Sequence, residues 1–153
     1  MTGATPGKLP ARILIVDDNS FGLSARKSVL QELGHEVVTS NSPQEALVLC
    51  SGASFQVIVT DYRMPGMNGV EFIRQLREQG TKVPVVLVSG FTDTLGLNEQ
   101  NTGADVVLQK SAHEVNHLIR AINRLLRKDL VRKPAGSQRG APGAPSKRNT
   151  PGQ

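Results

Sequence analysis

Five polar side chains of this 153-residue chain could act together in chemistry, because each follows an apolar segment: Asp17, Asp18, Asp61, Ser89 and Lys110. Three carboxylates about 5 Å apart repel one another by roughly 3 kcal/mol per pair at an effective dielectric of about 20. They cannot all stay ionised without a counter-charge, so such a cluster would demand a cation. Clustered oxygen donors with room for water suit Mg²⁺, which commonly bridges protein carboxylates to a phosphoryl group.

Each of these residues also has a simpler interpretation when it is taken alone. Acids after a strand, such as Asp17 and Asp18, are often helix caps or solvated loop groups. A single lysine such as Lys110 is usually a surface charge. The combination is what favours a site, because five polar groups stand at matching ends of four separate apolar segments.

The segments that would position these residues have the pattern of strands covered on both faces. They are continuous apolar runs rather than alternating ones, and the weakest of them is the second. The expected strands cover residues 12–16, 35–39, 56–60, 84–89 and 104–109.

Helical patterns separate the expected strands and have recognisable ends. Gly34 closes the first, Ser42 to Glu45 begins the second with an N-cap, a proline and a capping-box glutamate, and Ser111 to Glu114 begins the last with another capping box. The segment with Gly96 inside it is a poor helix. The expected helices cover residues 20–33, 42–52, 69–79, 92–100 and 111–127.

Strict alternation of strands and helices predicts an α/β fold: a five-stranded parallel sheet with right-handed crossovers and helices on both faces. Ligands in such folds gather at the carboxyl ends of the strands. The five polar side chains are therefore expected to meet at one edge of the sheet.

Four short motifs make the chain resemble the receiver domain of two-component response regulators. They are IVDDN at residues 15–19, DYRMPGMNG at 61–69, VSG at 88–90 and the single Lys110. The acid pair lies 43 to 44 residues before Asp61, and the lysine lies 49 residues after it. The resemblance covers roughly residues 11–128 and implies the flavodoxin-like (βα)5 receiver fold.

The resemblance implies phosphotransfer. A histidine kinase or a histidine phosphotransfer protein would present a phosphohistidine, and Asp61 would accept the phosphoryl group. Ser89 and Lys110 would help to neutralise the phosphoryl oxygens, which is the main need in phosphoryl transfer. Such a protein is not an enzyme in the usual sense, since it catalyses only its own phosphorylation and dephosphorylation.

The resemblance also implies a set of Mg²⁺ ligands. Asp18 and Asp61 would bind the ion through their carboxylates and Arg63 through its backbone carbonyl. Asp17 would bind it through water. This assignment agrees with the charge argument made from the residues themselves.

Receiver domains act as switches, and the resemblance places their output on the face of the fourth helix, fifth strand and fifth helix. This chain departs from the family there: Val107 stands where an aromatic residue is usual, and Ser111 stands where proline is usual. Coupling to output is therefore in question, whereas chemistry at Asp61 should survive. Arg63 and Phe91, two residues beyond Asp61 and Ser89, are expected to slow loss of the phosphoryl group to water.

The motif HEVNH, from His113 to His117, matches the HExxH helix signature of zinc metalloproteases. At 100° per residue both histidines fall opposite the apolar stripe, toward solvent, and no third ligand follows. Glu114 is already explained by the capping box. We therefore expect no zinc site.

Charge divides the chain into unlike parts. Residues 127–153 hold seven basic groups and one acid, so this segment is at +6, while residues 1–126 are at −1, which together give the net +5. We expect a flexible lead at 1–10, a receiver domain at 11–128 and a disordered basic tail at 129–153. The tail lacks aromatic residues for base stacking, so nucleic-acid binding is not favoured.

Other sequence features bear on the cellular location of the protein and on how it would signal. No apolar run is long enough for a membrane span, no secretory signal precedes the domain, and the single Cys50 cannot form an internal disulfide, so a cytoplasmic protein is expected. No output domain fits after residue 128, which predicts a single-domain regulator signalling by protein contact. The alternative is a phosphorylation-independent binding module whose basic tail binds an anionic partner.

Overall fold

Five parallel strands form one sheet in the computed structural model, which describes residues 10–90 and 95–132. The sheet order is β2-β1-β3-β4-β5, so β5 is an edge strand. The register pairs Val16 with Ser40 and Thr60, and Asp61 with Val88, which brings the carboxyl ends of the strands together. The strands are β1 (Arg12–Val16), β2 (Glu36–Ser40), β3 (Val57–Asp61), β4 (Val85–Ser89) and β5 (Val106–Gln109).

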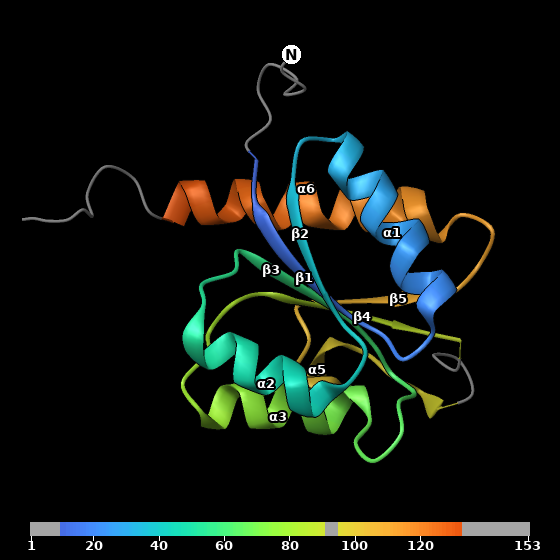
Figure 1. Ribbon diagram of the computed structural model, residues 1–153, viewed down its shortest axis with the longest axis vertical. Helices are drawn as coiled ribbons and strands as arrows, with labels where there is room; N and C mark the ends of the chain where they lie inside the picture. Colours follow the sequence, from blue (N-terminus) through green and yellow to red (C-terminus); the bar gives the residue numbers. More distant parts are fainter. Residues whose placement is uncertain (1–9, 91–94, 133–153) are drawn as a thin grey trace, which may run out of the picture.

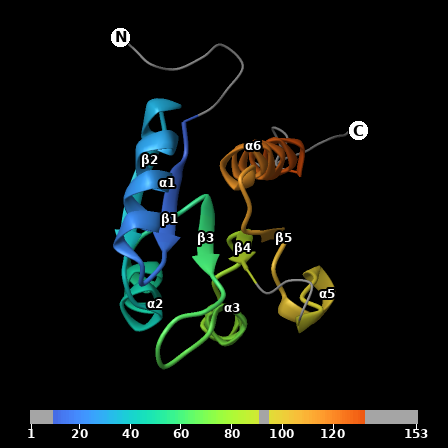
Figure 2. The same ribbon diagram turned by 90° about the vertical axis from the view of Figure 1, so that its right-hand side faces the viewer.

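Helices cover both faces of the sheet (Figures 1 and 2). On one side lie α1 (Ser20–Glu32) and α6 (Glu114–Arg132), and on the other lie α2 (Pro43–Gly52), α3 (Gly69–Glu78) and α5 (Glu99–Thr102).

Two apolar clusters fill the spaces between these layers. Successive strand residues point to opposite faces, so Ile13 and Ile15 pack in the cluster with Leu30 of α1, while Leu14 and Val16 pack in the other. The first cluster also contains Leu118, Ala121, Ile122 and Leu125 of α6, and the second contains Ala46, Phe72, Ile73 and Leu76 of α2 and α3.

The fold expected from the sequence is confirmed, with five parallel strands near the expected positions. Several helix ends also agree. Ser42 accepts a hydrogen bond from the Glu45 N–H at 3.1 Å, with Pro43 in the first turn, and Gly34 follows α1 at φ 96°. The Glu45 carboxylate differs from the expected capping box, because it accepts a hydrogen bond from the hydroxyl of Ser40 at 2.8 Å.

The prediction of a poor helix over residues 92–100 is wrong in the described part, where the helical conformation is interrupted. Gly96 has a φ of 66°, and Asn98 is extended and caps the four-residue α5 by accepting from the Asn101 N–H at 2.8 Å. A left-handed residue and an extended residue two positions later interrupt a helix. Residues 91–94 lie outside the described residues.

The last helix also differs from the expectation at both ends. The hydroxyl of Ser111 accepts from the His113 N–H at 3.1 Å, so it does not form the expected capping box with Glu114. The helix continues to Arg132 rather than fading near Arg127. Residues 1–9 and 133–153, which hold nearly all of the expected lead and most of the expected tail, lie outside the described residues.

Within residues 10–90 and 95–132, none of the helices has the length and apolar character needed to cross a bilayer.

Candidate functional site

A cleft of about 410 Å³ opens at the carboxyl edge of the sheet. It brings together five of the six residues expected there from the sequence. Asp18 and Asn19 follow β1, Asp61 and Arg63 belong to the end of β3 and its loop, and Ser89 ends β4. Lys110 follows β5.

The sixth expected residue, Asp17, does not line the cleft but belongs to the same acidic cluster. Carboxylate oxygens of Asp17, Asp18 and Asp61 all lie within 4.8 Å of one another, the one such group of three in the part of the chain described. Asp17 is 1% exposed and Asp61 5%, whereas Asp18 is exposed. Buried oxygen donors beside an exposed one fit a hard cation that keeps part of its water shell.

Lys110 supplies a positive charge to this cluster. Its Nζ lies 2.9 Å from Oδ1 of Asp61. Burial raises the pKa of Asp61 above its ordinary value, and the hydrogen bond from Lys110 opposes this increase only in part, while the nearby charge of Asp17 adds to it. The ionised carboxylate of Asp61 is therefore costly in this cleft, and an added cation would stabilise it.

Ser89 and Lys110 are held together by the backbone. Ser89 is fully buried at the end of β4, and its carbonyl accepts from the Lys110 N–H at 2.9 Å. The parallel pairing of β4 and β5 thus brings a hydroxyl residue and the ammonium residue to the same end of the sheet.

Gly69 lets the loop after Asp61 close tightly. Its N–H donates to the Tyr62 carbonyl at 2.6 Å, and Asn68 caps α3 by accepting from the Glu71 N–H at 2.9 Å. The last residues of DYRMPGMNG therefore supply a helix cap and a position without a side chain next to Asp61.

Arg26 is a site residue that was not expected from the sequence. It is 5% exposed, and its Nη1 lies 2.9 Å from Oδ2 of Asp17. Its Nη2 lies 2.7 Å from Oε2 of Glu114, at the start of α6. One signal was available, because Arg26 interrupts the apolar stripe of its helix between Leu23 and Leu30, and an arginine at a core position requires partners.

The two histidines of HEVNH do not form a metal site with Glu114. His113 and His117 are exposed, with ring centroids 6.3 Å apart. The Glu114 carboxylate binds Arg26 instead. The side chain that would act as the general base of an HExxH site is thus held by Arg26.

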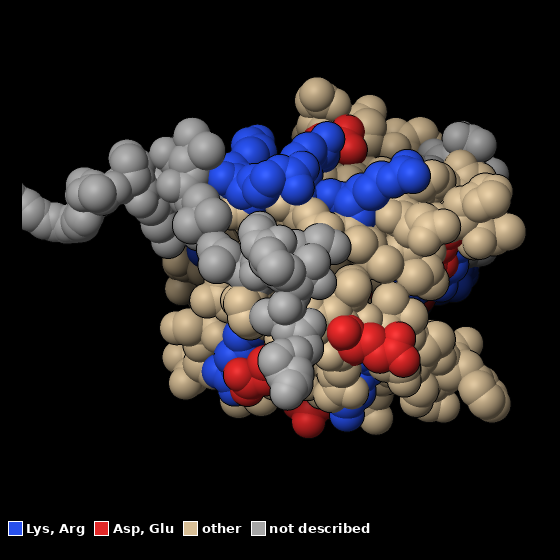
Figure 3. Space-filling view, turned by 90° about the horizontal axis from the view of Figure 1, so that it is seen from above, with Lys and Arg blue, Asp and Glu red and all other residues tan. Residues whose placement is uncertain are grey.

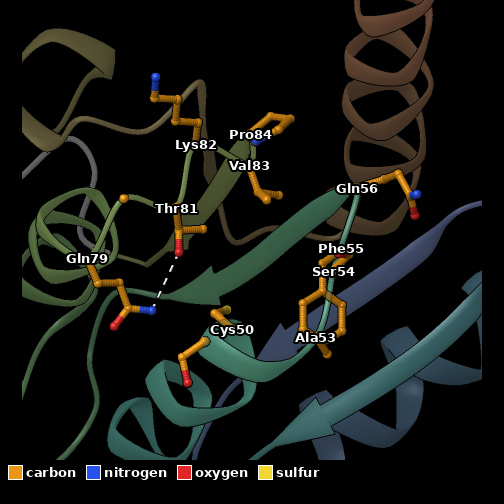
Figure 4. Close-up of a pocket in the computed structure, with 12 residues that line it drawn as sticks. Cys50, Ala53, Ser54, Phe55, Gln56, Gln79, Thr81, Lys82, Val83 and Pro84 are labelled. Atoms are coloured by element: carbon orange, nitrogen blue, oxygen red, sulfur yellow. Dashed lines mark hydrogen bonds between the residues drawn. The ribbon is translucent and has the colours of Figure 1, made fainter.

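A larger cavity of about 750 Å³ lies at the opposite ends of β3 and β4 (Figure 4). Lys82 is its one charged lining residue among those described, and Gln79 donates to Thr81 across 3.5 Å. Cys50 also lines it, and burial raises the pKa of this thiol to about 11, so the thiol is protonated at neutral pH. No carboxylate is among the described residues that line this cavity, so it lacks the ligands that a divalent cation prefers.

A groove of about 430 Å³ runs between the edge strand β5 and α6. Apolar Val106 and Leu108 line it together with Arg120, Arg124 and Arg127, which are exposed and make no ion pair with any described residue. Figure 3 looks onto the side that α1 and α6 cover and shows a band of Lys and Arg side chains there.

The fold and the cleft define a flavodoxin-like α/β protein with an acidic cleft at the carboxyl edge of its sheet. The chain belongs to the response regulator receiver domain family, whose sequence profile it matches over residues 13–123. Receiver domains are the phosphoacceptor modules of two-component signalling, so the chain is a signalling protein of that kind.

Curated relatives combine this domain with longer sequences. The chain is 37% identical over 93 residues to the hydrogenase transcriptional regulatory protein HoxA of Cupriavidus necator, which covers 58% of this chain and 19% of HoxA. It is 30% identical over 151 residues to the virulence sensor protein BvgS of Bordetella pertussis, covering 92% of this chain and 12% of BvgS. The chain is also 30% identical over 134 residues to the alkaline phosphatase synthesis transcriptional regulatory protein PhoP of Bacillus subtilis, which covers 84% of this chain and 53% of PhoP.

Solved structures agree with the fold assignment. The receiver domain of a Francisella response regulator superposes with a TM-score of 0.70 at 27% identity, covering 78% of this chain and 98% of that one. The response regulator TrrA of Thermotoga maritima, in complex with Mg²⁺ and BeF, superposes with a TM-score of 0.66 at 27% identity. This match covers 74% of this chain and 97% of the TrrA chain.

Proposed function

We propose that Asp61 is the phosphoacceptor of this receiver domain and that a histidine kinase or a histidine phosphotransfer protein is the donor. The observation that carries this proposal is the position of Asp61. Its buried carboxylate lies in the cleft, 2.9 Å from Lys110, and within 4.8 Å of two further carboxylates.

The transfer exchanges one bond to phosphorus for another. A carboxylate oxygen of Asp61 forms the new O–P bond as the N–P bond of the phosphohistidine breaks, and the electron pair of that bond returns to the imidazole nitrogen. Lys110 and the Ser89 hydroxyl are suited to compensate the charge on the phosphoryl oxygens, because phosphoryl transfer depends on positioning and charge stabilisation. A donor phosphorylated from ATP would act in the cytoplasm.

Mg²⁺ is the cofactor that fits the donor set of the cleft. Asp18 and Asp61 would hold it through carboxylate oxygens and Arg63 through its carbonyl, with Asp17 contacting it through water. When bound, the ion neutralises charge on the phosphoryl oxygens. The TrrA structure supports this proposal, since that relative carries Mg²⁺ and BeF.

The donor would approach past the start of α1. Phe21 is 86% exposed there, and its N–H donates to the side chain of Asn19, a cleft residue, at 2.9 Å. An exposed aromatic ring beside the cleft supports an apolar contact with the donor protein.

A downstream protein would dock on the face that α5, β5 and α6 form, which corresponds to the expected face of the fourth helix, fifth strand and fifth helix. The groove between β5 and α6 supports this, because it combines an apolar strand edge with the guanidinium groups of Arg120, Arg124 and Arg127. None of these three arginines forms an ion pair with an acid among the described residues. Such a surface suits an acidic protein segment with an apolar residue better than it suits nucleic acid, which would use the charges alone.

One experiment tests the acceptor. The wild-type chain is incubated with Mg²⁺ and acetyl phosphate, and the modified residue is identified by intact and peptide mass spectrometry. We expect modification that disappears in Asp61→Asn and persists in Asp105→Asn, an aspartate at the opposite end of the strands that serves as the matched control. If the wild type is never modified, the chain is instead a phosphorylation-independent binding module, and its basic residues become the first candidates for partner contact.

A further inference from the structure

Arg26 links the loop after β1 to the start of α6, which is distant from it in sequence. From α1 it reaches Asp17, nine residues earlier, and Glu114, 88 residues later at the start of α6. Its side chain is 5% exposed, and those of Asp17 and Glu114 are 1% and 15% exposed. A guanidinium group can bind two carboxylates at once because its donors form a rigid planar fork.

Space for this bridge is left by a glycine inside a helix. Gly22 lies one turn before Arg26 in α1, and a Cβ at that position would lie 2.7 Å from Oδ2 of Asp17. Glycine within a helix normally costs stability relative to alanine. Its presence here is explained by the room that Asp17 and Arg26 require.

The bridge occupies the carboxylate of Asp17. Its Oδ2 accepts from Arg26, and its Oδ1 accepts from the Asn19 N–H at 2.9 Å. A cation in the cleft must therefore share Asp17 with a guanidinium group that is already in contact with it. The three acids of the cleft face two internal cations, Arg26 and Lys110, rather than the single lysine expected from the sequence.

We propose that Arg26 is a positioning residue that competes with Mg²⁺ for Asp17 and thereby lowers the affinity of the cleft for the ion, and that Glu114 weakens this competition by binding the same guanidinium group. Metal affinity is then linked to the position of α6, because Glu114 moves with that helix. This inference rests on the proposed function, since it assumes that Mg²⁺ binds in the cleft.

The test measures Mg²⁺ binding and thermal unfolding without any phosphodonor. For Arg26→Met we expect a lower unfolding temperature in EDTA, because two acids lose their buried counter-charge. We also expect Mg²⁺ to bind about tenfold more tightly by calorimetry, the size of effect that one charge-assisted hydrogen bond can have. Arg26→Lys, which keeps the charge but not the fork, should give an intermediate affinity and serves if Arg26→Met does not fold.

A double-mutant cycle separates the bridge from simple long-range charge. Glu114→Gln alone should weaken Mg²⁺ binding, because Arg26 is then shared with fewer acids. In the Arg26→Met background the same Glu114→Gln change should have little effect. An equal effect of Glu114→Gln in both backgrounds would mean that its charge acts through space and would overturn the bridge.

Arg74→Met is the matched control, because Arg74 also pairs with two acids, Glu71 and Glu78, but on the exposed surface of α3. It should leave Mg²⁺ binding unchanged. If Arg26→Met binds Mg²⁺ as the wild type does, or more weakly, the competition is overturned while the proposed function stands. If the wild type itself binds no Mg²⁺, the proposed function fails first.

Discussion

Gly69 and Asp61 approach so closely that the first has no room for a side chain: a Cβ on Gly69 would lie 2.5 Å from the carbonyl oxygen of Asp61. It would also lie 2.7 Å from Cδ1 of Leu87 on β4. The start of α3 is thus packed directly against the end of the strand that carries the proposed phosphoacceptor.

Gly69→Ala is therefore expected to destabilise the domain. The added methyl group must displace backbone, and overpacking of this kind costs about 1–3 kcal/mol. Urea unfolding measures the change. Gly52→Ala, at the end of α2, is the control, because a Cβ there meets nothing within 4 Å and should leave stability unchanged or slightly higher.

Asp61→Asn is expected to raise the unfolding temperature at pH 7 in EDTA. Burial raises the pKa of Asp61, so the folded chain binds its proton more tightly than the unfolded chain does. The stability that this proton contributes is complete below the unfolded pKa of about 3.9 and is lost as the pH rises through the higher folded pKa.

The difference between Asp61→Asn and the wild type should therefore be largest near neutral pH and shrink toward pH 4, as measured by thermal unfolding across that range. An Asn variant that is less stable than the wild type at pH 7 would contradict the predicted cost of the buried charge.

Asp18→Asn is expected to remove most of the stabilisation by Mg²⁺. A ligand at one hundred times its dissociation constant stabilises a folded protein by about 2.7 kcal/mol. The free energy of unfolding of the wild type, measured by urea unfolding, should rise by this amount between EDTA and MgCl₂ at that concentration. The variant lacks one carboxylate of the cluster, so its free energy of unfolding should rise much less. A full gain in the variant would place the ion elsewhere.

Phe21→Ser is expected to slow transfer from a phosphorylated histidine protein while leaving modification by acetyl phosphate unchanged. The ring lies outside the cleft and would contact only a protein donor. Val48→Ser, at another exposed apolar side chain on α2, is the control and should affect neither rate. Equal slowing with both donors would show that Phe21 acts on the cleft itself.

Arg63→Ala is expected to shorten the lifetime of the phosphorylated form. Arg63 is an exposed residue that lines the cleft, and we expect its side chain to hinder the approach of water to the phosphoryl group. The decay of the modified mass after removal of the phosphodonor measures this lifetime. An unchanged decay would contradict the role assigned to Arg63. Phe91, for which the sequence predicts the same role, lies outside the described residues.

Local sequence determined the strands and most of the cleft. Apolar runs predict buried parallel strands wherever they occur, and residues directly after them must lie at the carboxyl edge of the sheet. For this reason the positions of Asp18, Asp61 and Lys110 along the chain are enough to predict that they lie together. The conformation of residues 92–100 was harder to predict, because a glycine in a weak helical pattern is compatible with either a helix or a break in one.

The sequence by itself therefore determined the order of the elements, the family and the acids at the ends of β1 and β3. Only the tertiary structure decided that Arg26 binds both Asp17 and Glu114, and that Glu114 serves this bridge rather than a helix cap. The physical reason is distance along the chain. Periodicity and capping are local properties, whereas a contact between residues 88 positions apart depends on how α1 and α6 pack on the same face of the sheet.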